Sequence, residues 1–159
     1  MKIKTIEDEN FTDYKLPSML IATAKCDWKC CREAGLSTEL CQNSELAKQP
    51  DIEVSCEEIY KRYIDNPITK AIVLGGLEPF LQIFEIIELI KYFRNKNCED
   101  PFVIYSGCEL NEVYSELMML NNNKNIIVKL GRYKLNYQPK FDEVLGITLA
   151  GENQKAYVL

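Results

Sequence analysis

Apolar residues along the chain gather in short runs flanked by glycine or polar residues. Runs of this length, rich in β-branched side chains, are typical of strands that are covered on both faces of a sheet. The pattern predicts five strands: Ser18–Thr23, Lys70–Leu74, Pro101–Tyr105, Asn125–Leu130 and Val144–Leu149.

Helical patterns lie between these runs. Ser55–Ile64 opens with Ser55 and carries Glu58 three positions later, which is the spacing of a capping box. Pro79–Asn95 begins with a proline suited to a first helical turn and continues with a wide apolar face. Glu109–Leu120 is the third predicted helix.

Strands that alternate with helices favour an α/β fold with a largely parallel sheet. Five or so strands are too few for a closed eight-stranded barrel, which needs about 250 residues. We therefore expect an incomplete β/α barrel, open on one side, formed by residues 1–159 as one domain.

Composition narrows the chemistry. The chain is 47% hydrophobic and 27% charged, so it can bury a core. A net charge of −5 argues against a nucleic-acid binder, because contacts of Lys and Arg with phosphates supply most of the affinity of such proteins for nucleic acid. No histidine is present, which excludes histidine general bases, nucleophile pairs that need histidine, and histidine metal ligands.

The compartment bears on how the seven cysteines are interpreted. The opening MKIKTIEDENF does not resemble a signal peptide, and no stretch approaches the roughly 18 apolar residues of a membrane span. We expect a cytoplasmic protein without a membrane partner. In that reducing compartment, clustered cysteines indicate metal binding or catalysis more often than disulfides.

Four cysteines fall within sixteen residues and come after the first predicted strand: Cys26, Cys30, Cys31 and Cys41. Loops that follow parallel strands build the sites of α/β folds. Soft thiolates without imidazole suit zinc or an iron–sulfur cluster. Three interpretations stay open here: a cluster, a four-thiolate structural zinc site, and ordinary buried cysteines. Cys56 and Cys98 are most simply structural, whereas Cys108 follows Ser106-Gly107 and could approach a site.

The segment Cys26-Asp-Trp-Lys-Cys30 resembles the opening of the radical S-adenosylmethionine (SAM) signature, in which a third cysteine follows after two residues. Glu33 stands at that third position here. Cys41-Gln42-Asn43 resembles the end of the signature in small activases, after an insertion of eight residues. The resemblance implies Cys26, Cys30 and Cys41 as cluster ligands, with Cys31 as the competing third ligand.

Gly75-Gly76-Leu77-Glu78-Pro79 resembles the radical-SAM Gly-Gly-Glu-Pro motif, with one leucine inserted. Glycines let the backbone approach a ligand closely. The resemblance implies that Gly75 and Gly76 border SAM and that the Glu78 carboxylate accepts a hydrogen bond from its ammonium group.

Later segments resemble anaerobic ribonucleotide reductase activases: Tyr105-Ser106-Gly107, Gly131-Arg132-Tyr133 and Gly151-Glu152-Asn153-Gln154. Lys129 and Leu130 stand where those activases carry an acidic residue before the Gly-Arg step. By this resemblance Ser106 lies near the ribose or methionine carboxylate of SAM, Gly107 gives backbone access, and Leu40 contacts the adenine.

The resemblance implies a [4Fe–4S] cluster and SAM as cofactors, with three cysteines on three irons and the fourth iron open to the methionine amino and carboxylate groups. The implied activity is reductive SAM cleavage and hydrogen abstraction from a glycine of a large partner, such as an anaerobic ribonucleotide reductase, with a low-potential electron donor. Two alternatives are a radical-SAM reaction on another peptide or nucleotide, and a non-catalytic iron–sulfur or zinc module.

Overall fold

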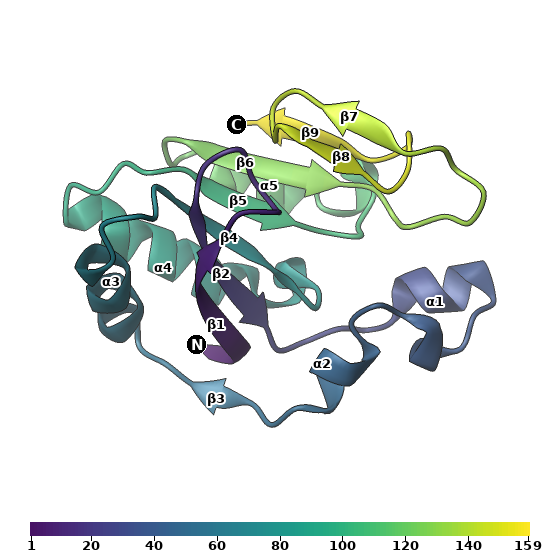
Figure 1. Cartoon of the computed structure of the whole chain (residues 1–159), viewed down its shortest axis with the longest axis horizontal. Coiled ribbons are helices and arrows are strands. Elements are labelled where there is room, and N and C mark those ends of the chain that lie inside the picture. The colour runs from purple at the N-terminus through teal and green to yellow at the C-terminus, as the bar shows by residue number, and fades with distance from the viewer.

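The computed structural model describes residues 1–159 and has a seven-stranded sheet at its centre (Figure 1). The strand order across the sheet is β3-β1-β2-β4-β5-β6-β9. The strands are β1 Lys2–Asn10, β2 Ser18–Thr23, β3 Ile52–Glu53, β4 Ala71–Gly76, β5 Phe102–Tyr105, β6 Ile126–Leu130 and β9 Lys155–Val158.

The middle of the sheet is parallel, as the sequence predicts. β2, β4, β5 and β6 pair in parallel, and they coincide with four of the five predicted strands. β1, β3 and β9 extend the two edges in antiparallel orientation and were not predicted. β1 contains no continuous apolar run, because its residues alternate between buried and exposed positions. The fold is thus a mixed α/β fold with a mostly parallel, open sheet, consistent with a partial β/α barrel.

The prediction of a strand over Val144–Leu149 needs correction. Only Ile147–Leu149 is extended, as β8, and it pairs antiparallel with β7, Lys140–Asp142, in a separate two-stranded sheet. Gly146 has a φ of +73°, so the chain turns immediately before β8. The fifth apolar run therefore belongs to a hairpin and not to the parallel sheet.

The predicted helices form, with interrupted starts in two cases. α3, Cys56–Asp65, begins with the expected capping box, since the Glu58 N–H donates to Ser55 Oγ at 3.1 Å and the Ser55 N–H donates to Glu58 Oε2 at 2.8 Å. The other two helices each open with a 3₁₀ turn. These elements are η2 Pro79–Gln82 before α4 Ile83–Asn95, and η3 Leu110–Glu112 before α5 Tyr114–Leu120.

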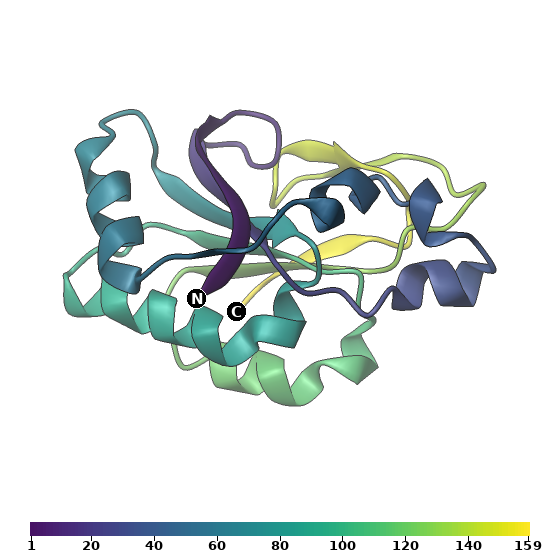
Figure 2. The ribbon, with the colours of Figure 1, turned by 90° about the horizontal axis from the view of Figure 1, so that it is seen from below.

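Two cores flank the sheet. α3, α4 and α5 lie together on one side of it (Figure 2), and 22 buried residues form the main core. A second core of 8 residues joins Ala71, Val73 and Val103 of the sheet to Leu145 and Leu149 of the β7–β8 hairpin. The hairpin therefore covers the face of the sheet that the helices leave free.

The connection from β2 to β4 carries the clustered cysteines on short elements. These are α1 Lys29–Ala34, η1 Thr38–Leu40 and α2 Ser44–Lys48. α1 projects from the body of the molecule in Figure 1. No helix anywhere in the chain is both long enough and apolar enough to cross a lipid bilayer.

Candidate functional site

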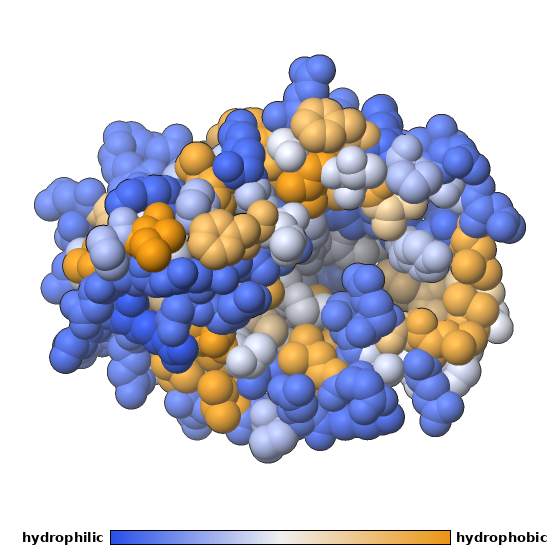
Figure 3. Space-filling view, viewed as in Figure 1, coloured by the Kyte–Doolittle hydropathy of each residue, from blue (hydrophilic) through white to orange (hydrophobic).

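The carboxyl ends of the four parallel strands meet at one edge of the sheet, and each end leads into a motif singled out in the sequence. Cys26 follows β2, Glu78 follows β4, Ser106 follows β5 and Arg132 follows β6. This edge is where parallel α/β folds place their sites. On the face seen in Figure 3, the surface is hollowed beside the cysteine-bearing segment.

The Glu78 carboxylate joins the second and third of these strand ends. Glu78 Oε1 accepts hydrogen bonds from Ser106 Oγ at 2.8 Å and from the Phe80 N–H at 3.1 Å, and Oε2 accepts from the Gly107 N–H at 3.0 Å. Burial raises the pKa of Glu78, while the hydrogen bond from Ser106 lowers it. The Ser106 hydroxyl also accepts from the Cys108 N–H at 2.9 Å. Glu78 of the glycine motif is thus in direct contact with Ser106 and Gly107, which both belong to the Tyr105-Ser106-Gly107 motif.

Gly75 and Gly76 differ in what surrounds them. Gly76 has a φ of +77°, and a Cβ at this position would lie 2.8 Å from Ala22 Cβ and 3.0 Å from Leu46 Cδ2. A Cβ on Gly75 would meet its nearest neighbours at an ordinary 3.7 Å. Asn43 Nδ2 donates to the Gly76 carbonyl. Gly76 therefore lets the segment after Cys41 pack onto the glycine turn, whereas packing within the protein does not require glycine at Gly75.

The first two cysteines of the cluster flank a left-handed residue. Trp28 has a φ of 59°, and its N–H donates to Cys26 Sγ at 3.3 Å just before α1 begins. A Cβ on Gly107 would lie 2.6 Å from Cys30 Sγ, so this thiol occupies space that a side chain on Gly107 would take. Burial raises the pKa of Cys26 to about 11 and also raises that of Cys30, where the nearby Arg132 opposes it.

The two candidates for a third ligand lie close to each other. Cys31 is the single buried residue of α1, and its pKa is raised by burial and by the nearby Cys41. Cys41 is half-buried at the end of η1. Both cysteines also lie close enough to Cys30 to raise the pKa of its thiol. Leu40, the expected adenine contact, is 71% exposed.

The donor set fits an iron–sulfur cluster. No three cysteine, aspartate or glutamate side chains converge on a point where a single metal ion would sit. A cluster does not need such a point, because each cysteine thiolate binds a different iron. The thiols of Cys26, Cys30, Cys31 and Cys41 supply the soft ligands that such clusters use, and Gly107 provides the space beside Cys30.

Sequence reasoning did not assign a role to two cationic residues that the structure brings to this edge. Lys129 is buried, its Nζ donates to the Gly131 carbonyl at 3.1 Å, and burial lowers its pKa to about 8 despite the nearby Cys30 and Glu78. Arg132 is also buried and pairs with carboxylates of α1 and of the η3 segment. No local pattern reveals the ion pairs of Arg132, because they join residues far apart along the chain.

The two motifs nearest the C-terminus contact each other. Asn153 Nδ2 donates to the Arg132 carbonyl at 2.8 Å, and Gln154 Nε2 donates to the Gly131 carbonyl at 3.3 Å. Gly131 has a φ of +106°, and a Cβ there would lie 2.7 Å from the Asn153 carbonyl oxygen. The segment before β9 thus holds the turn that carries Arg132.

The other three cysteines all pack against the main core. Cys108 is the one of them that reaches the site, since its N–H bonds to Ser106 and Glu78 lies near its thiol. Burial raises the pKa of Cys108 to about 11. Cys56 and Cys98 make no hydrogen bond to the motif residues described above, and their packing matches the structural role expected from the sequence.

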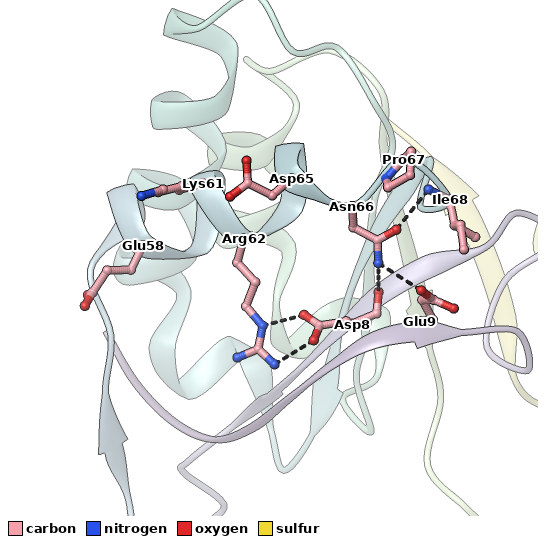
Figure 4. A pocket seen from close by; sticks show the side chains of 9 residues that line it. All are labelled: Asp8, Glu9, Glu58, Lys61, Arg62, Asp65, Asn66, Pro67 and Ile68. Atoms are coloured by element: carbon pink, nitrogen blue, oxygen red, sulfur yellow. Dashed lines mark hydrogen bonds and ion pairs between the residues drawn. The ribbon is translucent and has the colours of Figure 1, made fainter.

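A second depression lies between β1 and α3 and contains none of the predicted site residues (Figure 4). Arg62 binds Asp8 there through Nε and Nη2, and Asn66 Nδ2 donates to Glu9 Oε1 at 3.3 Å. The Arg62–Asp8 pair provides a useful comparison for ion pairs at the site.

Comparison with known protein families matches residues 19–148 to the family described as 4Fe-4S single cluster domain. No curated protein and no solved structure gives a significant match. The match begins inside β2 and extends into β8, so it covers the cysteine segment, the glycine turn and the ends of β5 and β6. The cofactors of this family are the [4Fe–4S] cluster and SAM. The chain therefore belongs to the 4Fe-4S single cluster domain family, within the radical SAM family of glycyl-radical activases.

Proposed function

We propose that this radical SAM protein installs a glycyl radical on a large partner protein, such as an anaerobic ribonucleotide reductase. The observation that carries the proposal is the contact of Glu78 with Ser106 and Gly107, beside the Cys30 thiol. Three motifs that the sequence relates to SAM binding and cluster binding thus meet at one edge of the sheet. If each motif resembled the family only by chance, the three motifs would not need to be neighbours in space.

Cys26, Cys30 and Cys41 are the proposed cluster ligands, with Cys31 as the alternative to Cys41. When bound and reduced, the cluster supplies one electron that breaks the S–C5′ bond of SAM, giving methionine and a 5′-deoxyadenosyl radical that takes a hydrogen atom from the partner's glycine Cα. A low-potential electron donor would be a second partner. Glu33, at the usual position of the third cysteine, is engaged by Arg132 at 2.9 Å, which supports a ligand later in the chain.

Glu78 is the proposed acceptor for the SAM ammonium. An ionised carboxylate offers about four lone-pair positions, and three are taken by Ser106, Phe80 and Gly107. One position remains for a cationic donor. The three fixed bonds hold the carboxylate in a single orientation, which suits a charge-assisted hydrogen bond. A Cβ on Gly75 would meet nothing closer than 3.7 Å, and Gly107 lets its backbone lie directly against the Cys30 thiol. Leu40 is exposed and is available to contact the adenine.

The choice of partner rests on the motifs near the C-terminus. Gly131-Arg132 and Asn153-Gln154 resemble segments of anaerobic ribonucleotide reductase activases, and the two contact each other. A radical destined for a protein backbone needs a site that a polypeptide loop can enter. The hollow beside the cysteine segment in Figure 3, at the end of an open sheet, supports such entry.

The proposal is tested by reconstituting the protein with iron and sulfide without oxygen, reducing it, adding SAM and measuring 5′-deoxyadenosine. We expect about four irons per chain and reductive cleavage. Cys41→Ala should abolish cluster assembly, whereas Cys31→Ala should retain it. Cys98→Ala is the matched control, because Cys98 packs against the core away from the site.

Two results would contradict the proposal at different levels. Assembly that survives Cys41→Ala and fails in Cys31→Ala would exchange the third ligand. A full cluster that never cleaves SAM would point to a non-catalytic iron–sulfur module. Where cleavage occurs, the partner is tested by incubation with an anaerobic ribonucleotide reductase, and the expected product is a glycyl radical signal in its electron paramagnetic resonance (EPR) spectrum.

A further inference from the structure

The helix that carries Cys30 and Cys31 has little apolar contact to hold it. α1 is six residues long, Cys31 is its one buried residue, and its N-cap residue Trp28 makes no capping side-chain bond. Helices this short are marginal in water, so their stability comes from tertiary contacts. Figure 1 shows α1 projecting from the sheet. Something other than a hydrophobic core must fix this helix at the site.

Ion pairs provide the contact. Arg132, at the end of β6, has a side chain that is only 5% exposed, and it reaches three carboxylates. Its Nε lies 2.9 Å from Glu33 Oε2 on α1, and its Nη2 lies 2.7 Å from Glu112 Oε1 on η3. Nη1 lies 3.7 Å from Glu109 Oε1. Lys29 on α1 binds the same Glu112 carboxylate, which closes the network between the helix and the sheet.

The helical geometry relates this network to the cluster thiol. Cys30 and Glu33 are three residues apart on α1, so they lie on neighbouring positions of one helical face. A guanidinium that grips Glu33 therefore also sets the distance of Cys30 from the strand ends. That distance is tight, because Cys30 Sγ occupies the space beside Gly107.

We propose that Arg132 is a positioning residue, whose guanidinium holds α1 through Glu33 and thereby places the Cys30 thiol at the carboxyl edge of the sheet. The inference rests on the proposed cluster site. It also explains the departure from the three-cysteine spacing: Glu33 stands where the signature has its third cysteine and serves as the anchor of the helix. Arginine suits the role because its guanidinium stays charged when buried and lies within ion-pair distance of carboxylates on both α1 and η3.

Hydrogen exchange in the protein without its cluster provides the first test. In Arg132→Gln and in Glu33→Gln, we expect the α1 amides to exchange about tenfold faster or more, since the tertiary contacts of the helix are lost. Glu33 is half-exposed, with 51% of its side chain accessible, so its substitution should not unfold the chain. Arg62→Gln breaks the ion pair with Asp8 far from the site and should leave α1 unchanged.

The second test distinguishes positioning from general support of the fold. After reconstitution to equal iron content, the reduced cluster of Glu33→Gln should give an altered EPR spectrum, while that of Arg62→Gln matches the unmodified protein. Arg132→Lys keeps a cation without the fork, so it should restore part of the exchange protection. Unchanged α1 exchange in Glu33→Gln, or a spectrum identical to the unmodified protein, would overturn the inference. Both readouts are independent of SAM cleavage, so a failure of the proposed function is recognised separately.

Discussion

At the scale of single residues, the two glycines at the end of β4 have different roles. Gly76 combines a left-handed φ of +77° with contacts to Ala22 and Leu46 that leave no room for a Cβ. Gly75 lies in the extended strand with neighbours at ordinary distance. The sequence alone treats the pair as equivalent, because either glycine can mark a turn or a close approach to a ligand. The structure separates a glycine needed by the fold from one that the fold does not require.

This difference predicts opposite outcomes for the two alanine variants. Gly76→Ala should lower the free energy of unfolding by about 2–4 kcal/mol, because overpacking adds to the strain of a left-handed residue. Gly75→Ala should change it by less than about 1 kcal/mol yet weaken SAM binding if the backbone there borders the cofactor. Urea unfolding of the cluster-free protein measures the first effect, and calorimetric titration of the reconstituted protein with SAM measures the second. Normal SAM affinity in Gly75→Ala would remove Gly75 from the proposed site.

At the scale of elements, η3 is coupled to α1 and to the end of β6 through one carboxylate. Glu112 accepts from Arg132 and Lys29, and these partners lower its pKa to about 2, from an ordinary value of 4.5. A lowered native pKa contributes stability that is complete above the unfolded value and is lost as the group is protonated on acidification. The contribution of Glu112 should therefore disappear between about pH 4.5 and pH 2.

The prediction is a loss of acid sensitivity in Glu112→Gln. At pH 6 the variant should be less stable than the unmodified chain by about 1 kcal/mol, since the carboxylate is partly exposed and the pairs are screened. The gap should narrow as the pH falls below 4.5. Thermal unfolding from pH 6 to pH 2 measures it, with Glu57→Gln on the exposed side of α3 as control. A gap that stays constant across this range would mean that the native pKa of Glu112 is not depressed.

How far the sequence predicts the elements depends on where their stability comes from. β2, β4, β5 and β6 are buried on both faces, so local composition predicts them, and the capping box marks the start of α3. β1 and β9 lie beyond this core as antiparallel strands with alternating exposure, and their pairing depends on distant neighbours. α1 and α2 bury almost no side chains, so the sequence shows no periodic pattern of apolar residues that would predict these helices.

The candidate site divides in the same way. Glu78, Ser106 and Gly107 stand in motifs that a reader of the sequence can relate to SAM binding, and they are neighbours in the structure. The role of Arg132 cannot be predicted from the neighbouring sequence, because its partners Glu33 and Glu112 come from the segments after β2 and β5. Ion pairs between loops follow from the order of the strands in the sheet, which the apolar runs alone do not determine.

At the scale of the whole molecule, the C-terminal part of the chain covers one face of the open sheet. The β7–β8 hairpin packs Leu145 and Leu149 onto the face opposite the helices. Asp142 connects this hairpin to the main sheet: its Oδ1 accepts from the Leu145 N–H at 3.0 Å, and its Oδ2 accepts from the Ala156 N–H of β9 at 3.0 Å. Because Gln154, just before β9, bonds to Gly131, the hairpin is coupled to the turn that carries Arg132.

Asp142→Ala should therefore affect a region larger than its own turn. Two backbone N–H groups would lose their acceptor, and we expect a loss of about 2–4 kcal/mol in the free energy of unfolding. Asp142→Asn keeps one oxygen and should lose about half as much. In hydrogen exchange, the amides of β8 and β9 should both become less protected in Asp142→Ala, while those of α3 and α4 change only with global stability. If β8 alone loses protection, the hairpin folds independently of the sheet edge. Asn153 and Gln154 would then hold the turn that carries Arg132 without a contribution from the hairpin.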